Sequence, residues 1–217
     1  MKSIRYYTPN EISLHNCAED CWVSIYDTVY DITSLIQNNR NELAEPLIKE
    51  AGRSISHWFD KKTKDIKTYM DPVRNIQLPY TPEGRFIHVP PADPCEWSTD
   101  YELPWWKDST YMIGKLTEKT RLVRIVNMLT RSEDVIQTCQ EETINDIRGR
   151  YLEYNKHAKS YTWKALIGDQ LVPMDMNKTL EENNVVDESE LFYELGMNDD
   201  YYIPTLHIYY NDDLTIA

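Results

Sequence analysis

Few residues of this chain have the types and spacing that catalysis or metal binding requires. The chain has only six Gly, and it contains no glycine-rich phosphate loop, no nucleophile turn and no cluster of His with carboxylates. Cys17 and Cys21 are the only closely spaced thiols, and they lack the further ligands of a zinc site. We therefore predict a protein that is not an enzyme and keeps its thiols reduced. Redox sensitivity of this Cys pair is the alternative.

The composition indicates a globular chain that binds neither nucleic acid nor a membrane. Hydrophobic residues make up 41% of the chain, and the formal net charge of −13 opposes binding to anionic surfaces, which needs clustered Lys and Arg. No segment approaches the ~20 apolar residues of a transmembrane helix, and the N-terminus lacks a signal-peptide pattern. We expect a cytoplasmic chain of two small domains, since one domain typically takes ~100–200 residues.

Local signals in the first half predict the elements that would position any site. Thr8, Pro9 and Glu11 form a capping-box pattern for the start of a helix, and Tyr26-Asp27 is a hairpin turn between alternating runs. The expected elements are a strand at 6–7, a helix from 9 to about 16, strands at 21–25 and 28–32, and a helix capped by Thr33 or Ser34. A further helix ends near 51–52, and a closing strand covers 111–116.

These elements and their motifs resemble the cytochrome b5 domain. The matching motifs are Tyr7-Thr8, His15-Asn16, Trp22-Val23, Val29-Tyr30-Asp31-Ile32-Thr33, Ala51-Gly52 through Phe59, and Ile113-Gly114-Lys115-Leu116. The resemblance implies a cytochrome b5-like domain at residues 1–120, interrupted by a Pro- and aromatic-rich insertion at about 71–110.

The same resemblance implies where haem ligands would lie. The first axial position falls on Asn39 and the second on Lys64, both in place of His, and neither side chain is a good iron ligand. Tyr69 is the nearest residue of a type that binds haem iron, and its phenolate prefers ferric iron. We expect either weak, redox-dependent binding of haem b at Asn39 and Tyr69, or no haem. His57 and His88 are predicted to be packed or hydrogen-bonded structural residues.

The insertion is rich in Pro and aromatic residues, which favours an extended segment lying over another surface. Its only strand-like run is 85–89. Its rings have two interpretations: they pin the segment onto the domain, or exposed rings anchor a partner. Trp97, Trp105 and Trp106 are the candidate interaction residues.

The second half has the pattern of a docking domain. Its expected elements are strands at 122–129 and 134–139, a helix capped by Thr143, a strand at 161–165 and a final strand at 205–210. This order, and the stretch 176–191, resemble ubiquitin. The resemblance implies a β-grasp domain at 121–217, and thus an α+β protein of two domains.

Motifs along the whole chain resemble a family of ciliary proteins in which a degenerate cytochrome b5-like domain precedes a ubiquitin-like domain. They include Arg-Phe-Ile-His-Val-Pro-Pro at 85–91, Pro-Trp-Trp at 104–106 and Ser-Tyr-Thr-Trp-Lys at 160–164. The resemblance implies a non-enzymatic structural subunit of the motile-cilium axoneme, in the cytoskeleton, with axonemal and radial spoke proteins as partners. The alternative is a haem-binding redox sensor or electron carrier with non-standard ligands.

Overall fold

The chain of 217 residues divides into two compact units in the computed structural model. The structure describes residues 4–91, 101–198 and 200–210. Unit 1 ends at Leu116 and unit 2 begins at Thr117, a few residues before the boundary expected after residue 120. Each unit has its own sheet and its own hydrophobic core.

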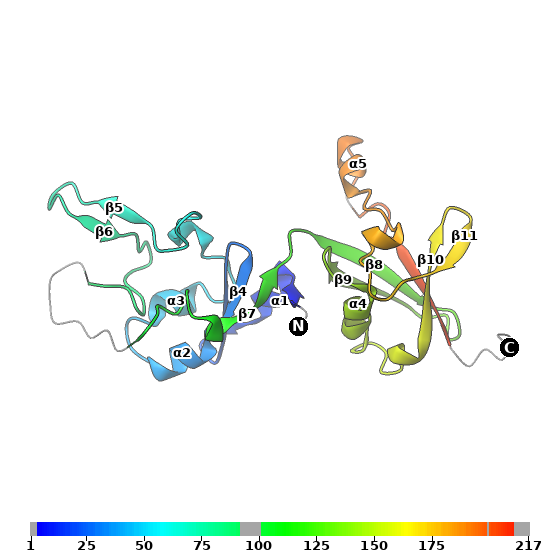
Figure 1. Cartoon of the computed structure of the whole chain (residues 1–217), viewed down its shortest axis with the longest axis horizontal. Helices are drawn as coiled ribbons and strands as arrows, with labels where there is room; N and C mark the ends of the chain where they lie inside the picture. Colours follow the sequence, from blue (N-terminus) through cyan, green and yellow to red (C-terminus); the bar gives the residue numbers. More distant parts are fainter. Residues whose placement is uncertain (1–3, 92–100, 199, 211–217) are drawn as a thin grey trace. The chain divides into compact units, whose positions relative to one another are not determined.

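Unit 1 is built on a mixed five-stranded sheet with the order β1-β7-β4-β3-β2 (Figure 1). The strands are β1 (Tyr6–Tyr7), β2 (Asn16–Cys17), β3 (Asp20–Ile25), β4 (Thr28–Asp31) and β7 (Met112–Leu116). Although β7 follows the insertion, it lies between β1 and β4, parallel to the first and antiparallel to the second. This confirms the expected closing strand. At Gly114 of β7, a Cβ atom would lie 2.3 Å from the Arg5 carbonyl oxygen, so the close approach of the chains requires glycine.

A side-chain hydrogen bond caps the start of the first α-helix of unit 1 but not those of the second and third. Its described helices are α1 (Pro9–Leu14), α2 (Thr33–Asn38), α3 (Glu45–Lys49) and the 3-10 helices Ser56–Trp58 and Ser109–Tyr111. The predicted capping box at α1 is confirmed, since Thr8 and Glu11 each accept a hydrogen bond from the other's backbone N–H. The predicted cap of α2 is wrong: neither Thr33 nor Ser34 caps it, and the Asp31 carboxylate instead accepts from the Thr33 N–H at 3.0 Å.

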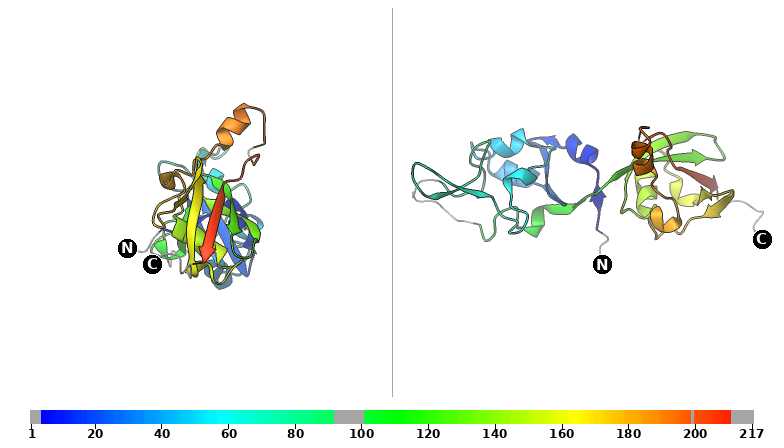
Figure 2. Two further views of the ribbon diagram at one scale, coloured as in Figure 1. Left: turned by 90° about the vertical axis from the view of Figure 1, so that its right-hand side faces the viewer. Right: turned by 90° about the horizontal axis from the view of Figure 1, so that it is seen from above.

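The region around the insertion contains a hairpin that the sequence does not predict. Its strands are β5 (Thr68–Met70) and β6 (Gln77–Pro79), and it projects from the rest of unit 1 (Figures 1 and 2). The strand expected at 85–89 does not form, because the chain turns at His88, which adopts a left-handed φ of 69°.

Unit 2 contains a second mixed five-stranded sheet, of order β11-β10-β12-β8-β9. The strands are β8 (Thr120–Asn127), β9 (Glu133–Cys139), β10 (Tyr161–Ile167), β11 (Gln170–Pro173) and β12 (Thr205–Tyr210). The last strand runs parallel to β8 and antiparallel to β10. Helix α4 (Ile144–Tyr151) begins at Thr143, whose predicted role as N-cap is confirmed by a capping box with Asp146. This order of strands and helix is the one expected for a ubiquitin-like β-grasp fold.

The connection to the final strand contains a helix that was not among the expected elements. After a 3-10 helix at Glu181–Asn183, the chain forms α5 (Ser189–Glu194), which projects away from the sheet of unit 2 (Figures 1 and 2). None of the residues of α5 is buried, whereas α4 buries Ile144, Ile147 and Tyr151 in the core. No helix in the described part of the chain is long and apolar enough to cross a membrane.

Candidate functional site

Aromatic side chains fill the interior of unit 1 beside α2 and α3. The buried rings are Trp58, Phe59, Phe86, Trp105 and Trp106, which share one core cluster with Leu35, Ile36 and Leu47 of the two helices. Trp105 packs edge-to-face against Tyr30 and Trp106, each with ring centroids 5.7 Å apart. Such pairs contribute roughly 0.5–1.5 kcal/mol beyond the burial of their area. The insertion therefore supplies part of the core of unit 1.

Trp105 and Trp106 do not have the exposed position that an interaction anchor needs. Their relative exposures are 0% and 5%, so their predicted interaction role is corrected to a core role. The third predicted anchor, Trp97, lies outside the described residues. The prediction of an extended segment lying over another surface holds for neither Trp105 nor Trp106, because both rings lie within the core of unit 1. The Pro- and aromatic-rich composition could not show which rings are buried.

Polar contacts seat the Trp105–Trp106 pair in this core. The Tyr30 hydroxyl donates to the Trp106 carbonyl at 3.0 Å, and burial, together with the Asp27 carboxylate, raises the pKa of Tyr30 to about 12. The Trp106 indole N–H donates to Asp65 at 3.1 Å. Burial acts to raise the pKa of Asp65, but hydrogen bonds from Lys107, from its neighbour's backbone N–H and from the indole outweigh it and lower that pKa.

His88 binds the backbone of the same Trp pair. Its Nδ1 accepts a hydrogen bond from the Trp105 backbone N–H at 3.0 Å, and its ring stacks on Tyr101 at 3.9 Å between centroids. The Tyr101 hydroxyl donates to the His88 carbonyl. Burial lowers the pKa of His88 although Asp108 favours its charged form, which suits an acceptor nitrogen. The predicted structural role fits this contact, but the strand expected around His88 is replaced by a turn.

Asn39 ends α2 as its C-cap and bonds to its own helix. Its side-chain Nδ2 donates to the Leu35 carbonyl at 2.9 Å, and its backbone N–H donates to the carbonyls of Leu35 and Ile36. This bond holds the side chain against its own helix, and the neutral amide oxygen that remains is a poor ligand for iron. The position that resembles the first haem-ligand site is thus part of a helix terminus.

The other haem-ligand positions lie on exposed backbone beyond the core. Lys64 has a left-handed φ of 52° in a tight turn, and Tyr69 lies on β5 with 47% of its surface exposed. No described hydrogen bond, ring contact or core cluster joins Tyr69 to Asn39. His57 is also exposed, so it is not the core residue that was predicted, although its ring contacts Trp58 edge-to-face with centroids 5.8 Å apart. Its carbonyl accepts from the Lys67 ammonium at 2.9 Å.

The residues present do not fit haem. The side chains at the ligand positions are a neutral amide bonded to its own helix, an exposed ammonium and an exposed phenol. Aromatic rings occupy the interior between the sheet and the two helices. The described residues include no group of three or more His, Cys, Asp or Glu that could hold a metal ion. The buried indole nitrogens of Trp58 and Trp105 have no hydrogen-bond partner in the described part of the chain. As donors, they could not ligate iron.

The two closely spaced thiols differ in environment. Cys17 is exposed, whereas Cys21 is buried at the start of β3. Burial, reinforced by the Asp31 carboxylate, raises the pKa of Cys21 to about 12. A thiol with that pKa is almost entirely protonated at neutral pH and is a poor nucleophile. Within this pair, only Cys17 remains available for redox chemistry.

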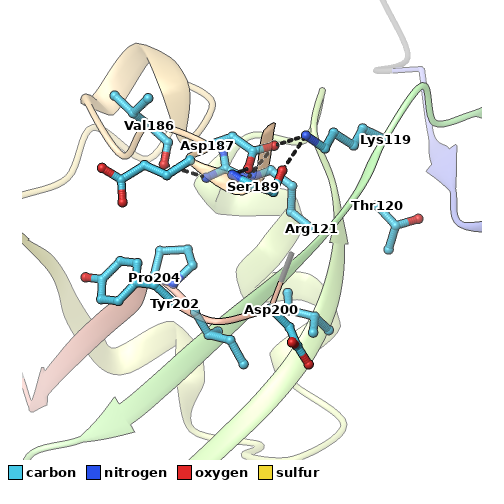
Figure 3. A pocket seen from close by; sticks show the side chains of 12 residues that line it. Lys119, Thr120, Arg121, Val186, Asp187, Ser189, Asp200, Tyr202 and Pro204 are labelled. Atoms are coloured by element: carbon cyan, nitrogen blue, oxygen red, sulfur yellow. Dashed lines mark hydrogen bonds and ion pairs between the residues drawn. The ribbon is translucent and has the colours of Figure 1, made fainter. Parts of the chain in front are cut away.

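A hollow of about 200 Å³ lies in unit 2 at the base of α5 (Figure 3). Its charged groups bind one another: Lys119 Nζ contacts the Asp187 carboxylate at 2.7 Å and the Ser189 hydroxyl at 2.6 Å. The buried Arg121 guanidinium donates to the backbone carbonyls of Val185 and Val186. Burial opposes ionisation of Asp187, but these cations and hydrogen bonds outweigh it and lower its pKa. The hollow is therefore a structural junction that holds the segment bearing α5, residues 188–198 and 200–202, which we call the arm.

The arm itself presents an apolar surface. Tyr193 and Leu195 have 81% and 61% of their surfaces exposed, and the other large exposed side chains of the arm are Leu191, Met197, Tyr201 and Tyr202. The helix ends in a Schellman motif at Gly196, which has a φ of 69°. Its length is thus defined, although it packs against no core. The arm thus leaves several large apolar side chains exposed to solvent.

Comparisons with known proteins match a family model to part of the first half of the chain and relatives to nearly all of it. A family model described as cytochrome b5-like heme/steroid binding domain matches residues 8–78. The chain is similar to cytochrome b5 domain-containing protein 1 of Xenopus tropicalis, with 51% identity over 97% of this chain and 96% of that protein. It is 47% identical to the protein of the same name from Homo sapiens, over 97% of this chain and 92% of that one.

Among solved structures, the chain has a ubiquitin-like neighbour. The chain is similar to the ubl5 domain from the polyubiquitin locus of T. thermophila, with 17% identity and a TM-score of 0.30. This match covers 42% of this chain and 93% of that domain.

Proposed function

The chain belongs to the family of cytochrome b5 domain-containing protein 1, and from this premise we propose that it is a non-enzymatic docking subunit of the motile-cilium axoneme, associated with the radial spoke. In this proposal unit 1 is a cytochrome b5-like domain reused as a rigid framework, and unit 2 is a ubiquitin-like docking domain. Its partners are axonemal and radial spoke proteins, and its location is the ciliary cytoskeleton.

The observation that carries the docking role is the arm at α5. A helix of six residues is too short to be stable alone in water, and α5 buries none of its residues. Tyr193 and Leu195 nevertheless extend into solvent. Covering these side chains with a partner surface would remove apolar area from water and would stabilise the helix at the same time. A docking function explains both features of the arm.

The closed core of unit 1 supports a role without cofactor chemistry. The rings of Trp105 and Trp106 occupy the interior, so side chains of the chain itself fill the core of unit 1. The alternative function, a redox sensor or electron carrier with weakly bound haem b, draws support from the family description alone. Titration of the purified chain with haemin, with and without oxidant, separates the two. A Soret band that is lost in Tyr69→Phe would favour the haem function.

Retention in isolated axonemes tests the docking function. A tagged chain expressed in ciliated cells is expected to stay with axonemes after detergent removes the membrane. The variant Tyr193→Ser/Leu195→Ser should reduce retention about tenfold, which corresponds to ~1.4 kcal/mol of binding free energy. The matched control is Tyr154→Ser/Leu166→Ser, which changes exposed residues of the same types elsewhere in unit 2. A wild-type chain found in the detergent-soluble fraction would refute the proposal.

A further inference from the structure

A basic segment stands out on unit 1 of this acidic chain. Four Lys occur within the eight residues 60–67, which we call the lysine loop, in a chain of net charge −13 with 23 Lys and Arg in all. Their positions are 61, 62, 64 and 67, and all four are exposed. Such a local excess of positive charge is unexpected from the composition of the whole chain.

The two acidic residues of the lysine loop are already held by other groups. The Asp60 carboxylate accepts from the backbone N–H groups of Lys62 and Thr63, each at 2.9 Å, and these bonds, more than the nearby Lys62 charge, lower its pKa. Asp65 binds Lys107 and the Trp106 indole. By contrast, no ion pair of Lys61, Lys62 or Lys64 occurs within the residues that the structure describes.

The lysine loop is anchored to the core. The Asp60 N–H donates to the Asp65 carbonyl at 2.8 Å, and Phe59 and Ile66 form an antiparallel bridge at the base of the loop. Phe59 is fully buried, and the Lys67 N–H donates to the Trp58 carbonyl at 2.8 Å. Binding to a loop that is already ordered requires little further loss of backbone entropy.

The exposed, apolar β5–β6 hairpin follows the lysine loop directly in the sequence. In the described part of the chain, β5 and β6 pair only with each other, so the two-stranded sheet has an open edge on each side. A hairpin of this size is marginally stable by itself. Its exposed apolar side chains are Tyr69, Met70, Val73 and Ile76, with Val73 at 91% exposure. Open strand edges accept extended peptides, while side chains beside the edge select their sequence.

We propose that the lysine loop and the β5–β6 hairpin together bind an extended acidic segment of a protein partner. The Lys ammonium groups would pair with its carboxylates, while its backbone adds to a hairpin edge. At ~0.15 M salt the Debye length is about 8 Å, so charges beyond the loop repel the segment only weakly. The inference rests on the docking role proposed above and adds a second surface to it.

The apolar hairpin favours a peptide over a nucleic acid. A nucleic acid would be bound mainly through its phosphates, which four Lys on a chain of net charge −13 serve poorly. A peptide can use both the ammonium groups and the exposed Tyr69 and Val73 side chains. Tighter binding of a nucleic acid than of the acidic peptide would therefore contradict the proposal.

Fluorescence anisotropy with the purified full chain tests this proposal. The probe is a labelled synthetic peptide, Glu-Leu-Glu-Tyr-Glu-Leu-Glu-Tyr, and the reference peptide has Lys in place of each Glu. The variant Lys61→Glu/Lys62→Glu should weaken binding of the acidic peptide at least tenfold. The control Lys156→Glu/Lys159→Glu changes the net charge equally at exposed positions in unit 2, and should weaken binding less than twofold.

Three results would overturn the proposal: equal weakening by both variants, no preference for the acidic over the basic peptide, or tighter binding of a single-stranded DNA oligonucleotide. The outcome of the axoneme experiment does not depend on the outcome of the peptide experiment. A chain that leaves the axoneme but binds the acidic peptide through Lys61 and Lys62 would refute the ciliary function alone. A chain that is retained in axonemes but does not bind the peptide would refute this inference alone.

Discussion

Replacing Trp105 with Ala tests whether the insertion forms part of the core of unit 1. The side chain is fully buried and makes edge contacts with Tyr30, Phe59 and Trp106. Truncation of a buried Trp typically costs ~3–5 kcal/mol. The indole N–H has no partner among the described residues, so its removal also eliminates a buried unsatisfied donor and offsets ~1 kcal/mol or more. We expect a net loss of about 3 kcal/mol in the free energy of unfolding of unit 1.

Amide hydrogen exchange followed by mass spectrometry suits this variant, because it resolves peptides of each unit and needs no Trp fluorescence. A loss of about 3 kcal/mol lowers the protection of globally exchanging amides in β3 and β4 roughly 100-fold, at ~1.4 kcal/mol per factor of ten. The matched control is Trp163→Ala in unit 2. Trp163 is also buried and its indole N–H also has no described partner, but its core is that of unit 2.

The two variants should give opposite patterns. Trp105→Ala should lower protection more in unit 1, and Trp163→Ala more in unit 2. A change of less than threefold in β3 and β4 for Trp105→Ala would show that the insertion does not pack into the core. Trp105→Phe, which keeps an aromatic ring, should lose less protection than the Ala variant.

Three further outcomes follow from single residues. Iodoacetamide at neutral pH should alkylate Cys17 in the folded chain and leave Cys21 unmodified, since burial raises the pKa of Cys21 to about 12; equal labelling would contradict its buried position. Folding lowers the pKa of Asp65, so its carboxylate stabilises unit 1 at pH values above its unfolded-state pKa, near 3.8. This stabilisation is lost as the pH falls through the pKa of the folded state. Asp65→Asn should therefore destabilise unit 1 at pH 7 and flatten this acid limb of its stability curve, measured by urea unfolding; an unchanged limb would argue against the effect. Gly114→Ala should destabilise unit 1 by about 2 kcal/mol or more, because the new Cβ meets backbone. Gly149→Ala, with open space in α4, should stabilise unit 2 by ~0.5–1 kcal/mol. Thermal melts in which both variants shift in the same direction would refute this contrast.

Local features were predictable where a few neighbouring residues suffice. The capping boxes at Thr8 and Thr143 depend on a side chain and an N–H three residues apart, so the sequence alone predicts where these helices begin. The replacement of ligand-type residues at Asn39 and Lys64 also follows from residue identity. The start of α2 was mistaken because Asp31, two residues upstream of Thr33, provides the hydrogen bond instead.

The candidate surfaces depended on contacts between distant residues. Trp106 is buried in a core that includes Tyr30, 76 residues earlier in the chain, whose hydroxyl donates to its carbonyl. No local pattern separates this core role from that of an exposed anchor. His88 turns the chain to reach the Trp105 backbone, and this contact replaces the expected strand.

The sequence by itself determined the types of side chain at the ligand positions and the residues at which α1 and α4 begin, because these follow from residue identity and from bonds over a few positions. Only the tertiary structure decided that the aromatic rings of the insertion lie inside unit 1, while α5 and the β5–β6 hairpin remain outside. Burial depends on which distant surfaces meet, and similar aromatic and aliphatic residues can serve as a core or as a docking surface.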